Sequence, residues 1–154
     1  MPMTALQLGS ELVRRSADRH YPVTNLTVQK LAYFAHGWHL ALLDLPLVDA
    51  EFEAWRYGPV LPELYHAYKA FGSNPIPPSH ALIALHPRDD LDAMSSKVID
   101  RVLDLYGNQS STRLVELSHD PKGPWGPAYS DINVSSTISN ASIRDYFRSL
   151  QTKQ

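Results

Sequence analysis

The sequence predicts a mainly α fold, a compact single domain (residues 1–154) of about six helices with a short extended element around residues 47–57. Apolar residues recur at three- and four-residue intervals over several long stretches, as on the buried side of a helix. Only one segment, which is bounded by turn signals, looks extended. At 154 residues the chain has the length of one domain and is able to bury roughly 70% of its unfolded surface.

The first helix is predicted from Thr4 to Arg19. It has an apolar and a solvated side, formed respectively by Leu8, Leu12 and Val13 and by Arg14, Arg15, Asp18 and Arg19. The pair Tyr21-Pro22 ends this helix, because the residue before a proline is pushed out of helical geometry.

The second helix is predicted from about Leu26 to Leu43, with Asn25 or Thr24 as its N-cap. Its apolar arc is wide enough for a central, heavily packed helix and holds Val28, Leu31, Phe34, Ala35, Trp38, Ala41 and Leu42. Gly37 costs roughly 1 kcal/mol relative to alanine, and its small size permits another element to approach closely. The opposite arc faces either solvent or a partner and includes Gln29, Tyr33 and His36.

The extended element follows the turn Asp44-Leu45-Pro46 and runs from Leu47 to Tyr57. Neither of its two sides is cleanly apolar, since they hold Phe52, Ala54 and Arg56 on one side and Glu53, Trp55 and Tyr57 on the other. We therefore expect a short or edge pairing rather than a central strand. Gly58-Pro59 is predicted to turn the chain.

Helices and turn signals alternate in the rest of the chain. Pro62 fits the first position of a helix that Gly72 ends. Four prolines make residues 73–87 a loop without a continuous helix or central strand. The remaining elements are a helix from Asp89 or Asp90 to Tyr106 that Gly107-Asn108 stops, a short helix capped by Ser110, a helical turn from Pro124 to Tyr129, and a last helix capped by Ser139.

The composition argues against several classes of protein. Net charge is −2, the pI is near 6.4 and no run of lysine or arginine occurs, so nucleic acid is not an expected partner. The absence of cysteine excludes disulfides, thiol catalysis and Cys-based zinc sites. No apolar run approaches the ~18 residues of a membrane span, and the N-terminal charges follow the apolar residues, the reverse of a secretory signal. We expect a cytoplasmic protein without a membrane segment.

The sequence carries no nucleophile elbow, zincin motif or nucleotide fingerprint, so we expect neither an enzyme nor a cofactor. Two alternatives remain open. His36 and His39 have a helical spacing that is able to bind a metal, although the simpler interpretation is one polar-face histidine and one partly buried, hydrogen-bonded histidine. His119 and Asp120, which follow Glu116, resemble a general-base pair, although the simpler interpretation is that they organise a loop.

Residues 51–74 crowd aromatic, charged and turn residues together. Aromatic residues and arginine gather where a surface binds a partner, and also where a small core needs bulk. Nothing in this stretch supplies a nucleophile, a metal cage or a phosphate loop. It favours a protein that binds over one that catalyses.

Four blocks of sequence resemble the successive blocks of the Panacea domain, also called the SocA-like or phage-associated GepA family. They are LTVQKLAYFAHGWHLAL (26–42), FEAWRYGPVLPELYHAYKAFGSNPI (52–76), STRLVELSHDPKGPW (111–125) and ISNASIRDYF (138–147). Their order and spacing fit the family, and together they span nearly the whole chain. The first two blocks are the most specific.

The resemblance implies an antitoxin that neutralises a cognate toxin by direct protein–protein contact. One branch of the family acts as a proteolytic adaptor that delivers its toxin to the protease ClpXP, which is the alternative function. The family has no established catalytic residues or cofactor, so none is carried over to this chain.

Neutralisation by contact calls for an interface with a few central anchors. We expect these partner-binding residues on the polar arc of the second helix, in the aromatic run and in the helix after it: Tyr33, His36, Arg56, Tyr57, Tyr65 and Tyr68. The proline-rich loop at residues 73–87 is a second candidate, since loops tolerate variation between partners.

Overall fold

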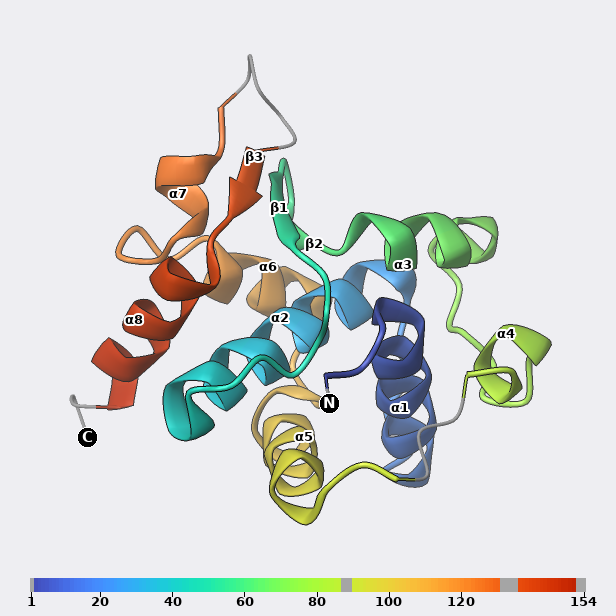
Figure 1. The fold of residues 1–154 in the computed structure, drawn as a ribbon. Coiled ribbons are helices and arrows are strands. Elements are labelled where there is room, and N and C mark those ends of the chain that lie inside the picture. The colour runs from blue at the N-terminus through green and yellow to red at the C-terminus, as the bar shows by residue number, and fades with distance from the viewer. Residues whose placement is uncertain (1, 87–89, 131–135, 152–154) are drawn as a thin grey trace.

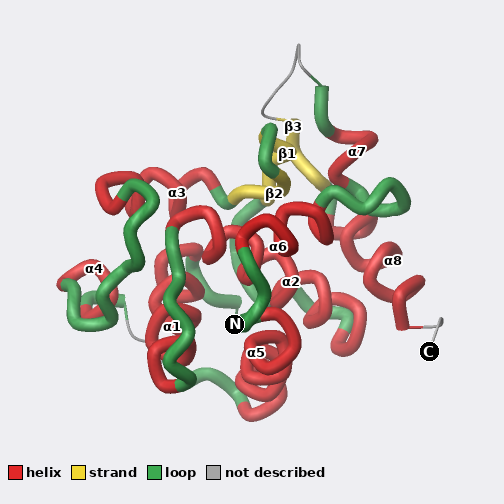
Figure 2. Tube along the Cα trace, turned by 180° about the vertical axis from the view of Figure 1, so that it is seen from behind, coloured by secondary structure: helices red, strands yellow, loops and turns green. Residues whose placement is uncertain are grey.

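The computed structural model describes residues 2–86, 90–130 and 136–151, and these ranges form a mainly α fold with one small sheet (Figures 1 and 2). The described elements are α1 (Ala5–Asp18), α2 (Asn25–Leu43), β1 (Phe52–Trp55), β2 (Gly58–Val60), α3 (Pro62–Tyr68) with the 3-10 turn η1 (Lys69–Phe71), α4 (Ala81–Ala84), α5 (Ala93–Tyr106), α6 (Ser111–Ser118), α7 (Trp125–Ala128), β3 (Ser136–Ile138) and α8 (Asn140–Gln151). Six of these described helices have seven residues or more, which confirms the predicted mainly α fold of about six helices.

Helix α2 lies at the centre of the fold, as its wide apolar arc predicts. It crosses the middle of the molecule in Figure 1 and packs against α1, α3, α5, α6, α8 and β2. Thr24 is its N-cap, with Oγ1 accepting a hydrogen bond from the Thr27 backbone N–H at 3.2 Å. Gly37 is the place where α8 comes closest, since an added Cβ would overlap the ring of Phe147. The predicted close approach at Gly37 is therefore confirmed.

The polar arc of α2 was expected to face solvent or a partner, and this expectation is wrong. Gln29, Tyr33 and His36 are exposed by only 1%, 1% and 0%. The sheet and α8 cover this side of the helix, so Gln29 and His36 find their hydrogen-bond partners inside the protein. The Tyr33 hydroxyl is buried without a hydrogen-bond partner among the described residues. Leu61 N–H donates to Gln29 Oε1 at 3.0 Å, and the ring of Tyr33 packs edge-on against Phe52.

The three strands form an antiparallel sheet in the order β2-β1-β3, beside α7 and α3 in Figure 1. The expected short element in residues 47–57 is confirmed by the four-residue strand β1, but the expected edge position is wrong, because β1 is the central strand. Strand β3 was not predicted, since Ser136-Thr137-Ile138 carries little apolar pattern of its own. It becomes a strand through its pairing with β1, where Ile138 lies opposite Phe52.

The turn between β1 and β2 lies at Arg56-Tyr57, two residues before the predicted turn at Gly58-Pro59. Trp55 pairs with Gly58 across this two-residue hairpin. Gly58 has a φ of +115°, a conformation that only glycine adopts without strain, and it starts β2. The turn thus points Arg56 and Tyr57 away from the sheet and into solvent.

Most local start and stop signals are confirmed, including Pro62 at the start of α3 and the caps Ser110, Gly107 and Ser139. Two predictions are wrong. Helix α5 starts at Ala93 with Asp92 as its N-cap, not at Asp90, and the alternative Asp89 lies outside the described residues. The proline-rich loop holds the short helix α4, which His80 caps through a hydrogen bond to Leu82 N–H. Pro87, at the end of this loop, also lies outside the described residues.

Candidate functional site

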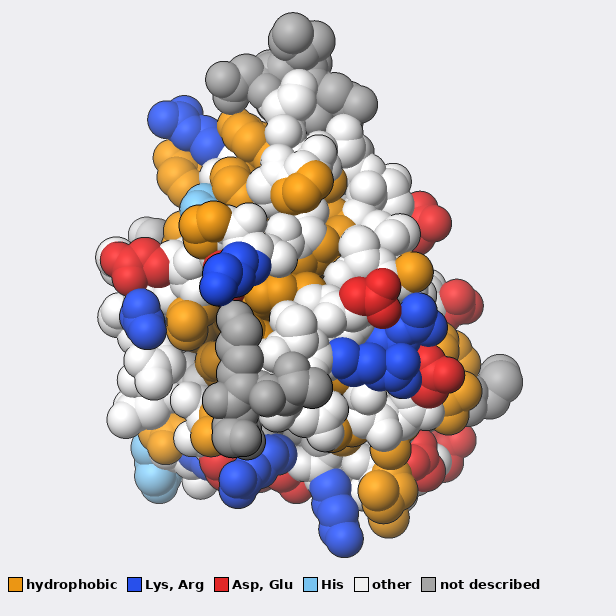
Figure 3. Space-filling model, turned by 90° about the vertical axis from the view of Figure 1, so that its left-hand side faces the viewer, with side chains coloured by type: hydrophobic (Ala, Val, Ile, Leu, Met, Phe, Trp, Pro, Cys, Tyr) orange, Lys and Arg blue, Asp and Glu red, His pale blue; other side chains and the backbone are white. Residues whose placement is uncertain are grey.

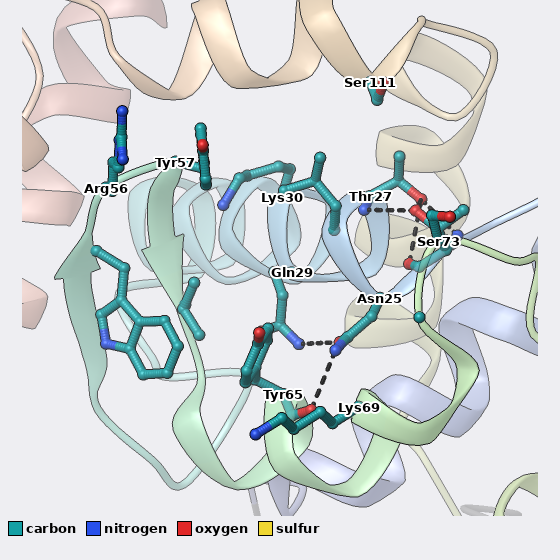
Figure 4. A pocket seen from close by; sticks show the side chains of 15 residues that line it. Asn25, Thr27, Gln29, Lys30, Arg56, Tyr57, Tyr65, Lys69, Ser73 and Ser111 are labelled. Carbon is teal, nitrogen blue, oxygen red and sulfur yellow. Dashed lines mark hydrogen bonds between the residues drawn. The ribbon is translucent and has the colours of Figure 1, made fainter.

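A recess of about 650 Å³ lies between the first half of α2, the β1–β2 hairpin and α3 (Figure 4). The turn after α3 and the first residue of α6 close its remaining sides. We call it the hairpin recess, and it is lined by Thr24, Asn25, Leu26, Thr27, Gln29, Lys30, Trp55, Arg56, Tyr57, Val60, Tyr65, Lys69, Gly72, Ser73 and Ser111.

The aromatic wall of the recess unites three of the six residues that the sequence proposes for partner binding. Tyr57 is 57% exposed at the hairpin turn, and the Arg56 guanidinium lies 5.5 Å from the centre of its ring. Tyr65 comes from α3 and meets Trp55 edge to face, with ring centres 5.0 Å apart. Two elements thus bring Arg56, Tyr57 and Tyr65 to one surface, as Figure 4 shows.

The other three proposed residues do not reach this surface. Tyr33 and His36 lie on the covered side of α2, as described above. Tyr68 is only 1% exposed because α3 turns it toward α1, where its hydroxyl faces Gly9. The expectation that these three side chains are available to a partner is therefore wrong.

A chain of hydrogen bonds forms the polar wall of the recess. Asn25 Nδ2 donates to the Tyr65 carbonyl at 3.0 Å, and Gln29 Nε2 donates to Asn25 Oδ1 at 3.0 Å (Figure 4). Together with the bond from Leu61 N–H to Gln29, this chain ties α2 to α3. The recess is therefore built on side chains that are already held in place, which reduces the entropy lost on binding.

Lys30 lies directly beneath the floor of the recess and was not singled out in the sequence. Its side chain is fully buried and reaches from α2 toward the hairpin, where Nζ donates to the Pro59 carbonyl at 3.1 Å (Figure 4). Burial lowers the pKa of Lys30 to about 7. The sequence offers one weak signal for it, a lone lysine between Gln29 and Leu31 on a helix with a wide apolar arc.

Replacing Lys30 with methionine is expected to raise the free energy of unfolding at pH 7 by about 2 kcal/mol, because the desolvation of the ammonium exceeds the one hydrogen bond that is lost. Urea unfolding measures the change. The exposed Lys69, replaced in the same way, serves as the matched control and should change stability by less than about 0.5 kcal/mol. A loss of stability in Lys30→Met would contradict this account.

His36 and His39 use their ring nitrogens within the protein. His36 Nε2 donates to Asn140 Oδ1 at 2.9 Å, and its Nδ1 accepts from two backbone N–H groups at 3.3 and 3.4 Å. His39 bonds the Leu45 carbonyl at 2.6 Å and Ser95 Oγ at 2.8 Å. The predicted polar-face position of His36 is wrong, and the hydrogen-bonded position of His39 is confirmed. Within the described ranges, no group of three His, Asp or Glu is placed to hold a metal ion.

His119 and Asp120 organise the loop before α7, as the simpler interpretation predicts. The His119 ring stacks on Trp125 with ring centres 3.9 Å apart, and Trp125 Nε1 donates to the Trp55 carbonyl at 2.6 Å. Asp120 accepts a hydrogen bond from the Tyr146 hydroxyl at 2.7 Å. These contacts hold the back of the β1–β2 hairpin against α7 and α8.

None of the described helices has the length and hydropathy that crossing a membrane requires.

The chain is similar in sequence to one group of antitoxins. The sequence profile described as "Antitoxin SocA-like, Panacea domain" matches residues 28–126, a stretch that holds both strands of the hairpin. The chain is 37% identical over 157 residues to Antitoxin SocA of Caulobacter vibrioides (strain NA1000 / CB15N), and the match covers 94% of this chain and 82% of that relative. No solved structure matches the chain.

Proposed function

This chain belongs to the family of SocA-like antitoxins with a Panacea domain, and on that premise we propose that it neutralises a cognate toxin by direct protein–protein contact. The observation that carries the proposal is the hairpin recess. Arg56, Tyr57 and Tyr65, which the sequence proposes for partner binding, come together there from two different elements. Neutralisation by contact requires no catalytic group, and His36, His39 and His119 make structural contacts within the described part of the chain.

The hairpin recess has the composition of an interface centre. Specific protein interfaces bury on the order of 1,600 Å² in total, and a few tyrosine, tryptophan and arginine side chains supply most of the binding energy. Tyr57 projects from the two-residue turn beside Arg56, while Trp55 and Tyr65 form the wall behind them. A toxin segment that enters the recess would exclude water from these side chains.

Tyr57→Ala is expected to weaken toxin binding about thirtyfold, because truncation of a central tyrosine removes roughly 2 kcal/mol of binding energy. Isothermal titration with the purified toxin measures the affinity, and growth rescue measures neutralisation in cells. Tyr57 is exposed, so the variant should keep its thermal stability. Leu85→Ala, at a 70% exposed position after α4, is the matched control. If a folded Tyr57→Ala protein binds the toxin with full affinity, the hairpin recess is not the toxin-binding site.

A proteolytic adaptor that hands the toxin to ClpXP is the second candidate, and one observation favours it. An adaptor needs a second docking surface besides the one that holds its client. Leu42, Met94 and Leu105 are each more than half exposed between the C-terminal end of α2 and α5, whereas the hairpin recess lies at the first half of α2. Figure 3 shows hydrophobic side chains interspersed with charged ones on the face that includes α8.

Co-expression with the product of the adjacent gene separates the two candidates. Growth rescue with a stable complex supports neutralisation by sequestration. Growth rescue without a complex, together with ClpXP-dependent loss of the toxin, supports the adaptor. A neighbouring protein that is harmless and does not bind would contradict both.

A further inference from the structure

The hairpin recess is positively charged in a chain that is acidic as a whole. Lys30, Arg56 and Lys69 are among its lining residues, and no aspartate or glutamate is. The chain has 16 acidic and 14 basic residues and a net charge of −2, so three cations without one carboxylate are a local departure from its composition.

The three cations also lack carboxylate partners. Several other arginines of the fold are paired: for example, Arg15 lies 3.1 Å from Asp100, and Arg19 lies 3.1 Å from Asp104. Within the described ranges, no carboxylate lies within 4.0 Å of Lys30, Arg56 or Lys69. Their charges are thus left for a group outside the chain.

Lys30 is the most informative of the three cations, because it is the one that is buried. Its amine has one hydrogen-bond acceptor, the Pro59 carbonyl, although an ammonium has three donors. Burying a cation without a counter-charge opposes folding, so its position beneath a binding recess favours a role in binding over one in stability. Burial lowers the pKa of Lys30 to about 7, so a bound carboxylate would favour its charged form. In the low-dielectric interior that charge acts more strongly on the carboxylate than the charge of a solvated lysine would.

The three cations occupy different sides of the recess. In Figure 4, Arg56 lies at the hairpin end, Lys69 lies beside α3, and the Lys30 amine lies toward the hairpin. Arg56 has a planar fork that is able to hold a carboxylate through two hydrogen bonds. The lining also includes apolar groups, among them Leu26, which is 37% exposed, and the ring of Tyr57.

We propose that the hairpin recess binds an acidic segment of the toxin, which brings one or more Asp or Glu side chains to Arg56, Lys69 and Lys30 and an apolar side chain to Leu26 and Tyr57. The inference rests on the proposed function and names the chemistry of the partner at that site. A protein carboxylate fits better than a nucleic acid, because phosphate backbones are bound by extended basic stripes. Here three basic residues line a recess of about 650 Å³, and the sequence of this acidic chain has no run of lysine or arginine.

The test reverses two exposed charges of the recess, Arg56→Glu with Lys69→Glu. Because both side chains are exposed, the variant should fold normally, which thermal unfolding checks. We expect it to bind purified toxin about a hundredfold more weakly than the unchanged protein. The unchanged complex should also weaken as sodium chloride rises, since salt screens charge attraction.

The matched control reverses one arginine and one lysine elsewhere, Arg101→Glu with Lys97→Glu, on the exposed side of α5. This control changes the net charge by the same amount. Its affinity for the toxin should stay within about threefold of that of the unchanged protein, because the long-range effect of distant surface charges is screened. A lysine scan of the toxin's Asp and Glu residues should then find a position that restores binding to the doubly reversed antitoxin.

The outcomes separate this inference from the proposed function. If Tyr57→Ala loses affinity for the toxin but the variant with Arg56→Glu and Lys69→Glu keeps full affinity, the proposal of an acidic toxin segment is overturned. The antitoxin role is then still supported. Equal losses in both charge-reversal variants would overturn the proposal of an acidic segment too, since net charge and not the recess would then decide. Competition by a nucleic acid for the recess would overturn the assignment to a protein carboxylate. Failure of the unchanged chain to bind or neutralise any neighbouring protein would refute the proposed function itself.

Discussion

Gly37→Ala is expected to separate α8 from α2 and to lower the free energy of unfolding by about 3 kcal/mol. The new methyl group would overlap the ring of Phe147, which is fully buried in α8. That ring cannot move aside, because Tyr33 and Trp38 pack against it with ring centres 5.4 and 5.2 Å away. Helix propensity alone predicts the opposite sign, a gain of roughly 1 kcal/mol for alanine over glycine.

The sign of the change in urea unfolding therefore decides between packing and propensity. Gly126→Ala is the matched control, since a Cβ at Gly126 in α7 has no atom within 4 Å, and it should leave stability almost unchanged. In a Phe147→Leu background, which lacks the ring, Gly37→Ala should destabilise much less than in the unchanged protein. A Gly37→Ala protein at least as stable as the parent would show that α8 does not pack this closely.

The free energy of unfolding is expected to fall by about 3 kcal/mol between pH 7 and pH 4 because of His36 alone. Burial lowers the pKa of His36 to about 4, against a weaker opposing effect of its hydrogen bond to Asn140. The folded protein thus favours the neutral ring, which matches Nδ1 accepting from the backbone N–H groups of Leu47 and Val48. This stability is present above the unfolded pKa of 6.5 and is lost as pH falls from there toward 4.

Urea unfolding at several pH values between 7 and 4 measures this loss. His36→Gln should be less stable at pH 7 and should show a shallower decline toward acid, since glutamine does not titrate. His66→Gln, on the exposed side of α3, is the matched control and should keep the full decline. A decline that is equally steep in His36→Gln would assign the acid sensitivity to other groups. His39 contributes in the same direction, because burial also lowers its pKa.

The candidate site was predictable in the hairpin and, among the residues proposed on the helices, only at Tyr65. The crowding of aromatic and charged residues marked Arg56 and Tyr57 as candidates. The sequence predicted them at the end of a strand, before a turn at Gly58-Pro59, whereas the structure places them in the turn itself. On α2 and α3, exposure depends on which elements pack on each side. A polar residue such as His36 then looks like a surface residue in the sequence, although the fold supplies its partner, Asn140, from 104 positions away.

Lys30 was missed for the same reason. Lysine is expected on a surface, and nothing in its neighbours indicates that the carbonyl of Pro59 will accept its hydrogen bond inside the protein. Because Lys30 is buried beneath it, the aromatic surface is also a site of positive charge. This charge is one basis of the acidic partner segment proposed above. That property is visible only when α2 and the hairpin are placed side by side (Figure 4).

The sequence by itself determined the long helices, most of their ends and the family, because these depend on residues close together in the chain. Thr24, Ser110 and Gly107 act within one helical turn of the ends that they define. Only the tertiary structure decided that β1 is central and that residues 136–138 form a strand, since their hydrogen bonds join segments about 80 residues apart. It also decided which polar side chains of α2 and α3 are buried, because burial depends on what the rest of the fold places against them.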